Sequence, residues 1–240
     1  IELGLVGSEM CIRDRLNMDK IMKIETEYDV KSMFFWLAKQ GPFAGIKNAA
    51  YDIKSRRVLQ AVRQIEAAGF ENGLHKSTFP ESYSAEMKNL PFPAFANRNH
   101  YLRIRLPVSF SIMEESGLKL DSSLGFAEKM GFRNSFGMPF RPFDMKAGRA
   151  FNLVEAPLHI MDATLLFYSD FSMAIAKNNC VDFMEKNREN AAISILWHNS
   201  YFSEYKFKDA LTLFKTILAY CGENRLESVS AKQIIEEFGL

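Results

Sequence analysis

The feature that most constrains this chain is the alternation, from Asp19 onward, of short apolar runs with amphipathic helical segments. The continuous apolar run KSMFFWLA, residues 31–38, is typical of a strand buried on both faces. The segment SRRVLQAVRQIEAAGF, residues 55–70, carries one apolar helical stripe and closes at Gly69, a favourable C-cap. The stripe consists of Val58, Val62, Ile65 and Ala68. Strands that alternate with helices predict repeated βα units around a parallel sheet.

The same reasoning extends along the rest of the chain. Further strands are expected within 71–75, 100–106, 118–126, 151–162 (one extended strand or a pair) and 191–199, and helices within 82–90, 107–117, 163–189, 205–221 and 230–238. The segment 131–148 is dense in Gly, Pro and aromatic residues and predicts a long structured loop, a type of loop that is often functional. No repeat or linker interrupts this pattern, so a single domain is expected.

Composition excludes several classes of protein. The 240 residues are 48% hydrophobic and 25% charged, as in globular proteins, and no run of about 18 apolar residues predicts a membrane span. The formal charge of +1 gives no electrostatic reason to expect a nucleic-acid partner. Cys180 and Cys221 are isolated, which predicts two free buried thiols in a reducing compartment and favours the cytoplasm. The oligomeric state stays open.

The first residues do not fit the pattern of the domain. The stretch VGSEMCIRDR has neither strand nor helix periodicity and lacks the apolar region of a secretory signal. Written as codons, it matches a transposase adapter used to prepare sequencing libraries. We therefore expect 1–18 to be non-native or disordered, and 19–240 to form the domain. The alternative is a natural N-terminal arm.

Two of the four histidines fall where active-site groups collect. His75 and His198 end predicted strands, in GLH and ILWH, whereas His100 and His159 lie elsewhere in the pattern. In parallel α/β architectures, the carboxyl ends of the strands carry the site. The alternative for each is a hydrogen-bonded structural histidine.

Six strings in this sequence resemble the polysaccharide deacetylase family. They are GLHKSTF, NRNHYLRIRLP, DSSLGFAEKMGFR, MPFRPFDM, APLHIMDATL and ILWHN, and the resemblance covers about residues 25–225. It implies an α/β fold, an irregular (β/α) barrel, and a hydrolase that removes acetyl groups from N-acetylated sugars with a divalent metal, usually zinc. Such an amidohydrolase acts on carbon–nitrogen bonds other than peptide bonds.

The resemblance implies a metal site at His75, which suits zinc as a neutral imidazole. The family places a second histidine four residues later, where this chain has Phe79. His100 or a carboxylate would then complete the site, and the alternative for His100 is a structural role.

Three further residues match catalytic motifs of the family. His198 corresponds to the histidine of the Leu-x-His motif, which protonates the departing amine as a general acid. Arg105 corresponds to the arginine that orients a catalytic carboxylate, with Arg103 as a competing choice. Asp121 is either a supporting carboxylate or the first residue of an Asx turn.

Three more residues are candidates for contact with a carbohydrate substrate. Arg133 and Asp144 lie in or beside the aromatic loop, where the alternative is that they pair with each other and fix the loop. Trp197 neighbours His198, and the alternative for Trp197 is the hydrophobic core.

The resemblance also implies a pair of aspartates on the first strand, which supply the catalytic base and one metal ligand. No such pair stands upstream of residue 31, so we expect an open sheet edge there and a chain that is inactive or nearly so. Two other readings remain. One is a non-catalytic carbohydrate-binding or scaffolding protein on the same barrel. The other is a hydrolase-like barrel with an unrelated substrate.

Overall fold

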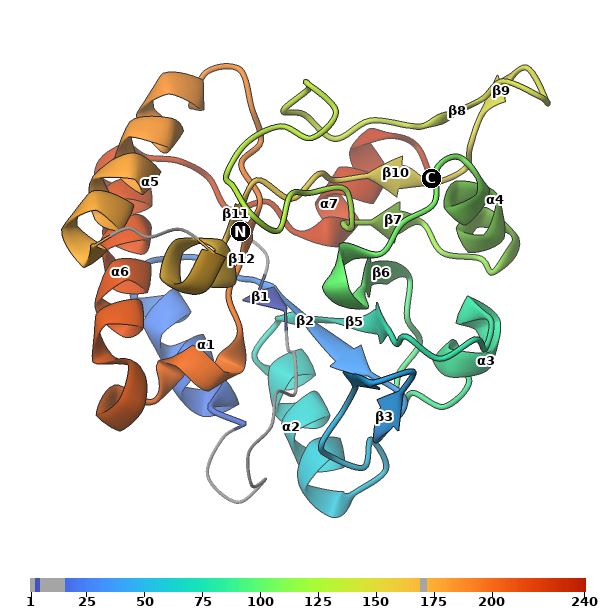
Figure 1. Ribbon diagram of the computed structural model, residues 1–240, viewed down its shortest axis with the longest axis horizontal. Coiled ribbons are helices and arrows are strands. Elements are labelled where there is room, and N and C mark those ends of the chain that lie inside the picture. Colours follow the sequence, from blue (N-terminus) through green and yellow to red (C-terminus); the bar gives the residue numbers. More distant parts are fainter. Residues whose placement is uncertain (1–2, 5–15, 169–171) are drawn as a thin grey trace.

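The computed structural model of this chain describes residues 3–4, 16–168 and 172–240 (Figure 1). The elements in chain order are β1 Leu3–Gly4, α1 Met18–Glu27, β2 Met33–Leu37, β3 Pro42–Phe43, β4 Ile46–Lys47, α2 Arg56–Ala67, β5 Glu71–Lys76, α3 Tyr83–Met87, β6 Ala96–Asn99, α4 Val108–Glu115, β7 Leu120–Asp121, β8 Phe143–Asp144, β9 Arg149–Ala150, β10 Val154–Glu155, β11 Ile160–Met161, α5 Met173–Asn187, β12 Ile195–Leu196, α6 Glu204–Glu223 and α7 Ala231–Glu237.

A six-stranded sheet in the order β1-β2-β5-β6-β7-β10 forms the centre of the molecule. Each neighbouring pair in it is parallel, and β11 and β12 form a separate parallel pair. All five residues of β2 are buried, as expected for a strand covered on both faces. The predicted α/β class with a parallel sheet is confirmed, and the described ladders end at β10 without closing a ring.

Helices surround this sheet in the manner of βα units. Figure 1 shows α1, α5 and α6 toward one side of the molecule and α3 and α4 toward the other. The apolar stripe of α2 is buried through Val58, Val62 and Ile65, and Gly69 after the helix has φ 76°, as a C-cap glycine requires. Ala68, expected on the same stripe, is exposed. None of the described helices is long and apolar enough to cross a membrane.

The sheet edge beside β2 differs from the expectation. The sequence predicts an open edge, whereas Leu3 and Gly4 pair in parallel with Phe34 and Phe35 of β2. Residues 5–15, most of the stretch expected to be non-native, lie outside the described residues. The described chain resumes at Leu16, and α1 starts at Met18, which is buried.

The strand predicted over residues 100–106 is wrong. The strand is β6, and His100–Leu102 form a 3₁₀ turn in which Tyr101 and Leu102 have φ 58° and 52°. Alternating apolar and charged residues in HYLRIRL imitate a half-buried strand. Strand β6 itself is mostly polar. Its buried side chains contact other polar groups, and Asn97, for example, donates to Asp121 at 2.7 Å.

Three segments near the C-terminal half also refine the prediction. The loop 131–148 contains β8, which pairs with β9 as a short antiparallel hairpin. The segment 151–162 is a pair of strands, β10 and β11, which belong to different ladders. The helical stretch predicted over 163–189 divides into a π-helical turn, Thr164–Tyr168, and α5.

Candidate functional site

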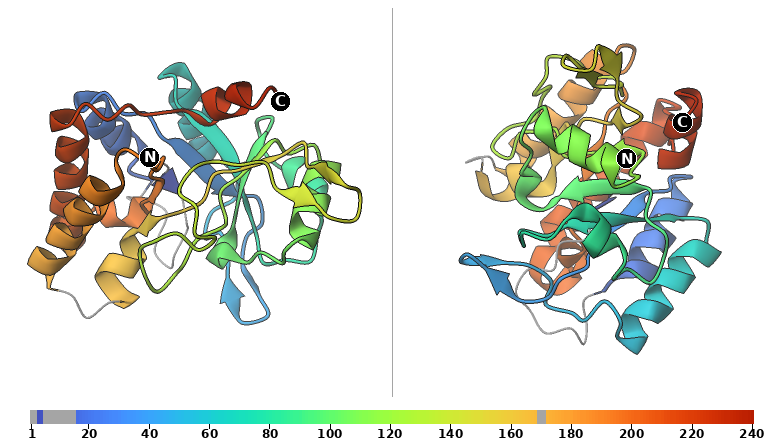
Figure 2. Two further views of the ribbon diagram at one scale, coloured as in Figure 1. Left: turned by 90° about the horizontal axis from the view of Figure 1, so that it is seen from above. Right: turned by 90° about the vertical axis from the view of Figure 1, so that its right-hand side faces the viewer.

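A cavity of about 190 Å³ lies at the carboxyl ends of the parallel strands. Its lining residues are His75, Arg98, Asn99, His100, Tyr101, Leu102, Ala127, Met161, Ala163, Tyr168, Leu196, His198 and Tyr201. They converge because the parallel strands β5 and β6 and the parallel strands β11 and β12 both end at this cavity. Figure 2, in the view from above, shows this side opposite α7. The structure therefore brings the predicted residues His75, His100 and His198 into one cavity.

His75 and His100 face each other within this cavity. His75 Nε2 and His100 Nδ1 are 3.1 Å apart. The outer nitrogen of each ring meets a backbone carbonyl, with His75 Nδ1 2.8 Å from the oxygen of Arg98 and His100 Nε2 2.9 Å from that of Lys47. A carbonyl oxygen only accepts hydrogen bonds, so both outer nitrogens carry the proton. In the neutral rings, the two inner nitrogens therefore present lone pairs to each other.

Burial keeps both rings neutral. His75 is 2% exposed and His100 is 4% exposed. Burial holds the pKa of His75 well below its ordinary value, and the neighbouring His100 lowers it further. Burial also lowers the pKa of His100 to about 4. At neutral pH, both inner nitrogens are therefore available as ligands rather than as donors.

The pair has the spacing that a zinc ion would use. At Zn–N distances of about 2.0–2.1 Å and tetrahedral angles, two ligand nitrogens lie about 3.3 Å apart. The backbone carbonyls supply the outer hydrogen bonds that usually fix the tautomer of metal-bound histidines. Across residues 3–4, 16–168 and 172–240, no group of three His, Cys, Asp or Glu side chains could hold a metal ion. The pair thus offers two protein ligands.

His198 has a different partner on the opposite side of the cavity. Its Nδ1 donates to Oδ1 of Asp162 at 2.6 Å, and its backbone N–H donates to Oδ2 of the same carboxylate. The Asp162 side chain is fully buried, whereas that of His198 is 16% exposed. The register that pairs Ile160 with Ile195 brings the ends of β11 and β12 together. This arrangement leaves Nε2 of His198 for the contents of the cavity.

Tyrosines and one arginine complete the lining. Tyr101 and Tyr168 are 60% and 55% exposed, and the ring of Tyr201 lies 5.8 Å from that of His198. Arg98 is fully buried; it donates to the carbonyl of Ser122 at 2.9 Å and to its hydroxyl at 2.7 Å. Amphipathic rings around a few fixed polar groups are typical of small-molecule sites.

Asp121 and Trp197 lie away from the cavity. The Asp121 carboxylate is fully buried and accepts hydrogen bonds from Asn97 and Ser123, which matches the Asx-turn alternative. Burial raises its pKa. Trp197 is also fully buried, and its ring centroid lies 5.2 Å from that of Phe214. This matches the alternative that Trp197 belongs to the hydrophobic core.

The structure does not bring the remaining predicted residues into the cavity. Arg105 is exposed, with its backbone N–H donating to Ser109 Oγ at 2.9 Å. Arg133 donates to the carbonyl of Gly125 at 3.1 Å, and Asp144 accepts from backbone N–H groups in the β8–β9 turn. The side chains of Arg133 and Asp144 therefore each bind backbone groups that lie within a few residues of them in the sequence.

Sequence reasoning missed Asp162, Arg98 and the three tyrosines. A signal existed for Asp162, because it follows the apolar run LHIM just as His198 follows ILW. Arg98 had no comparable signal, since the strand that carries it was placed four residues too late. To predict that the tyrosines line the cavity, one would have to know where two turns lie, and hydrophobic periodicity does not reveal this.

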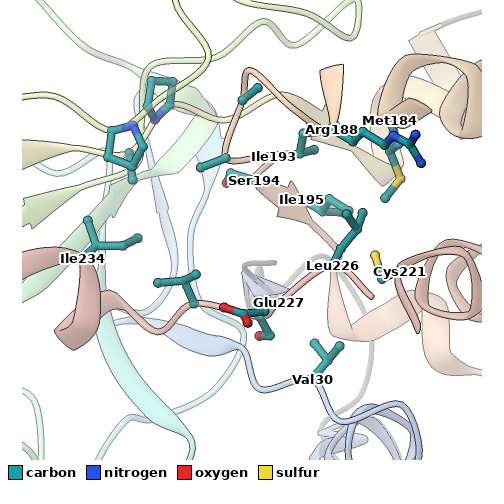
Figure 3. Close-up of a pocket in the computed structure, with 17 residues that line it drawn as sticks. Val30, Met184, Arg188, Ile193, Ser194, Ile195, Cys221, Leu226, Glu227 and Ile234 are labelled. Atoms are coloured by element: carbon teal, nitrogen blue, oxygen red, sulfur yellow. The ribbon is translucent and has the colours of Figure 1, made fainter. Parts of the chain in front are cut away.

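A second cavity, of about 210 Å³, lies at the amino ends of the strands (Figure 3). Val30 before β2, Ile193 before β12, and the segment between α6 and α7 contribute to its wall. Most of its lining is apolar, and it contains no histidine. Three of the four histidines therefore line the cavity at the carboxyl ends.

The comparisons with known proteins concern the fold. No protein-family model matches the chain, and no curated protein sequence matches it. A Mycobacterium smegmatis structure classed as a polysaccharide deacetylase aligns at TM-score 0.60 and 17% identity, covering 92% of this chain and 76% of that one. The chitin deacetylase of Colletotrichum lindemuthianum aligns at TM-score 0.56 and 11% identity, covering 97% and 85%.

A protein with a different activity shares the same fold. The 4-alpha-glucanotransferase of Thermococcus litoralis aligns at TM-score 0.54 and 11% identity, covering 99% of this chain and 40% of that one. These likenesses establish a fold shared with polysaccharide deacetylases. The chemistry of this chain has to be argued from its own residues.

Proposed function

We propose that this chain is a metal-dependent, deacetylase-type hydrolase that removes acetyl groups from N-acetylated sugars of a polysaccharide or glycan. The observation that carries the proposal is the convergence of two neutral imidazole lone pairs, His75 Nε2 and His100 Nδ1, at 3.1 Å. The carboxylate-backed His198 lines the same cavity. A Lewis-acid site beside a proton-transfer group is what hydrolysis of an amide requires.

In this proposal, His75 and His100 hold a divalent metal, which we expect to be zinc. When bound, the metal would lower the pKa of a water molecule and polarise the acetyl carbonyl. The carbonyls of Arg98 and Lys47 keep the two rings in the ligating tautomer.

His198 is the proposed general acid. Water adds to the acetyl carbon and gives up one proton to solvent, the carbon–nitrogen bond breaks, and the departing sugar nitrogen takes a proton from Nε2 of His198, which solvent then reprotonates. The products are acetate and the free amino sugar. Asp162 holds the ring through Nδ1 and stabilises the protonated imidazole before transfer.

Arg98 is a cationic residue at the wall of the cavity. It lines the cavity together with both metal-site histidines, whereas the predicted Arg105 is exposed elsewhere. Its guanidinium is anchored by Ser122 and lies 4.8 Å over the ring of Phe35. In this proposal, Arg98 is therefore a fixed positive charge beside the site rather than a group that binds the substrate.

One observation favours a non-catalytic carbohydrate-binding protein as the second candidate. In the part of the chain that the structure describes, no third metal-ligating side chain joins the histidine pair. For the same reason, we expect turnover by this chain to be slow. Sugar binding without acetate release would identify the binding protein.

The test combines zinc titration with an assay of acetate release from N-acetylated chito-oligosaccharides. We expect one zinc ion per chain, with an affinity lost in both His75→Ala and His100→Ala. His159→Gln is the matched control, because His159 is also buried, at 3% exposure, but lies outside the cavity. Zinc-dependent acetate release should disappear in His198→Ala. Zinc affinity that is unchanged in both pair variants would overturn the proposed metal site.

A further inference from the structure

The ring of His100 depends on a segment far from it in sequence. Its outer nitrogen, Nε2, donates to the carbonyl of Lys47, which belongs to the hairpin formed by β3 and β4. The hairpin strands are two residues each and lie outside the central sheet. The position of this carbonyl is therefore set by whatever fixes the hairpin to the rest of the molecule.

Asn48 makes that connection. Its side-chain amide donates to Thr78 Oγ1 at 3.0 Å and to the Gly41 carbonyl at 3.2 Å. Its Oδ1 accepts the backbone N–H of Thr78 at 2.9 Å. Asn48 is 2% exposed, so water does not readily replace these bonds. One side chain thus ties both arms of the hairpin to the loop that follows β5.

The loop after β5 is itself held by hydrogen bonds to a buried carboxylate. Glu86 is fully buried and accepts from Lys76 Nζ at 2.7 Å, from the Ser77 N–H at 3.0 Å and from the Ser77 hydroxyl at 2.5 Å. Phe79, in the same loop, packs 5.0 Å from the ring of Phe43 on the hairpin. Phe79 occupies the position at which the resemblance implies a second histidine. In this chain, it packs against the hairpin instead.

We propose that Asn48 is a positioning residue, which latches the β3–β4 hairpin to the loop after β5 and so fixes the tautomer of His100. With the Lys47 carbonyl in place, the proton sits on Nε2, and the lone pair on Nδ1 faces His75. Without the latch, that proton is free to move to Nδ1, and the pair loses one of its two ligating atoms. The link to zinc affinity rests on the proposed function, whereas the link to the tautomer does not.

The first experiment reads the tautomer directly in metal-free protein. Long-range ¹H–¹⁵N spectra of histidine-labelled protein, with the His100 signal assigned through His100→Gln, distinguish protonation at Nε2 from protonation at Nδ1. We expect the wild type to show the Nε2–H form alone, and Asn48→Ala to show a mixture. Asn187→Ala is the matched control, because Asn187 also donates to a backbone carbonyl but lies on α5.

The second readout is zinc affinity. Loss of the hydrogen bond behind a metal-bound histidine typically weakens binding by about 10–100-fold, and we expect Asn48→Ala to fall in this range. If Asn48→Ala does not fold, Thr78→Val serves instead, because it removes only the hydroxyl partner of Asn48. It should shift both readouts in the same direction by less.

The outcomes separate the two proposals. A single Nε2–H tautomer of His100 in both Asn48→Ala and Thr78→Val would overturn the latch. A tautomer that shifts in these variants, in a protein that binds no zinc, would support the latch and overturn the proposed metal site.

Discussion

Two regions of one cavity hold the same kind of side chain against different hydrogen-bond partners. On the β5–β6 side, His75 and His100 are backed by neutral backbone carbonyls and face each other. On the β11–β12 side, His198 is backed by the buried carboxylate of Asp162. In the proposed function, the carbonyl-backed rings are the metal ligands and the carboxylate-backed ring is the general acid.

The comparison suggests a rule for these rings: the group that accepts the hydrogen bond from one ring nitrogen determines the protonation state available to the other ring nitrogen. A carbonyl oxygen fixes a tautomer without adding charge. Burial then dominates the pKa of the ring, and the ring stays neutral. A carboxylate fixes a tautomer and also offsets the charge of an imidazolium. The following predictions test each half of this contrast.

The largest expected effect comes from removing the carboxylate. Asp162→Ala leaves the backbone N–H of Ala163 and both the backbone N–H and Nδ1 of His198 without their acceptor. Each buried donor left without an acceptor typically costs about 1–3 kcal/mol of unfolding free energy, so we expect a total loss of several kcal/mol, which chemical denaturation measures.

Asp144→Ala is the control for that variant. Asp144 also accepts two backbone N–H groups, at 2.9 and 3.1 Å, but it lies in a hairpin turn that water reaches. Its loss should cost about 1 kcal/mol or less. Equal losses in the two variants would mean that Asp162 is an ordinary turn residue.

The next effect is a pH dependence of stability from His100. Its pKa is about 4 in the folded protein against an ordinary 6.5, so the folded state binds fewer protons between these values. The unfolding free energy therefore falls as pH drops from about 6.5 to about 4. His100→Gln removes this contribution, which amounts to about 3 kcal/mol at 1.36 kcal/mol per pKa unit.

The measurement is the difference in unfolding free energy between the wild type and His100→Gln at pH 7 and at pH 4. The difference is needed because other groups titrate in the same range. Burial raises the pKa of Glu25 to about 8, so Glu25 makes stability fall as pH rises from about 4.5 to about 8. Glu25 is common to both proteins and cancels. A constant difference would show that His100 has an ordinary pKa.

The smallest expected effect is the pH dependence of zinc affinity. An imidazole with a pKa of about 6.5 is almost fully protonated at pH 5, which would weaken zinc binding by about thirtyfold per ring. With a pKa of about 4, His100 is only about one-tenth protonated at that pH. We expect affinities at pH 5 and pH 7 that agree within about twofold, as measured by competition with a chelator. A thirtyfold loss would contradict the neutral pair.

The sequence predicts the apolar parts of this architecture better than the polar ones. Strand β2, helix α2 and the ends of β5 and β12 follow from apolar runs and stripes, which report burial directly. His75 and His198 are found for this reason, since each ends such a run. Strand β6 was missed because its buried residues are polar and satisfied by other strands, as in the Asn97–Asp121 contact.

The pairing of site residues depends on register, which one sequence does not display. Asp162 and His198 meet because Ile160 aligns with Ile195. His75 and His100 meet because β5 and β6 are adjacent and a 3₁₀ turn bends the chain directly after β6. Arg105 and Asp144 carry suitable chemistry, but Arg105 is exposed outside the cavity and the Asp144 carboxylate binds the turn of its own hairpin. Side-chain type alone therefore does not locate the site.

The most direct test of the central claim is X-ray absorption at the zinc edge of the loaded protein. The neutral pair predicts two imidazole nitrogens at about 2.0–2.1 Å from the metal in the wild type, and no zinc signal above background from His75→Ala that is loaded and desalted in the same way. His159→Gln should keep both. A spectrum without imidazole ligands, or one that His75→Ala leaves unchanged, would contradict the assignment of His75 and His100 as the metal site.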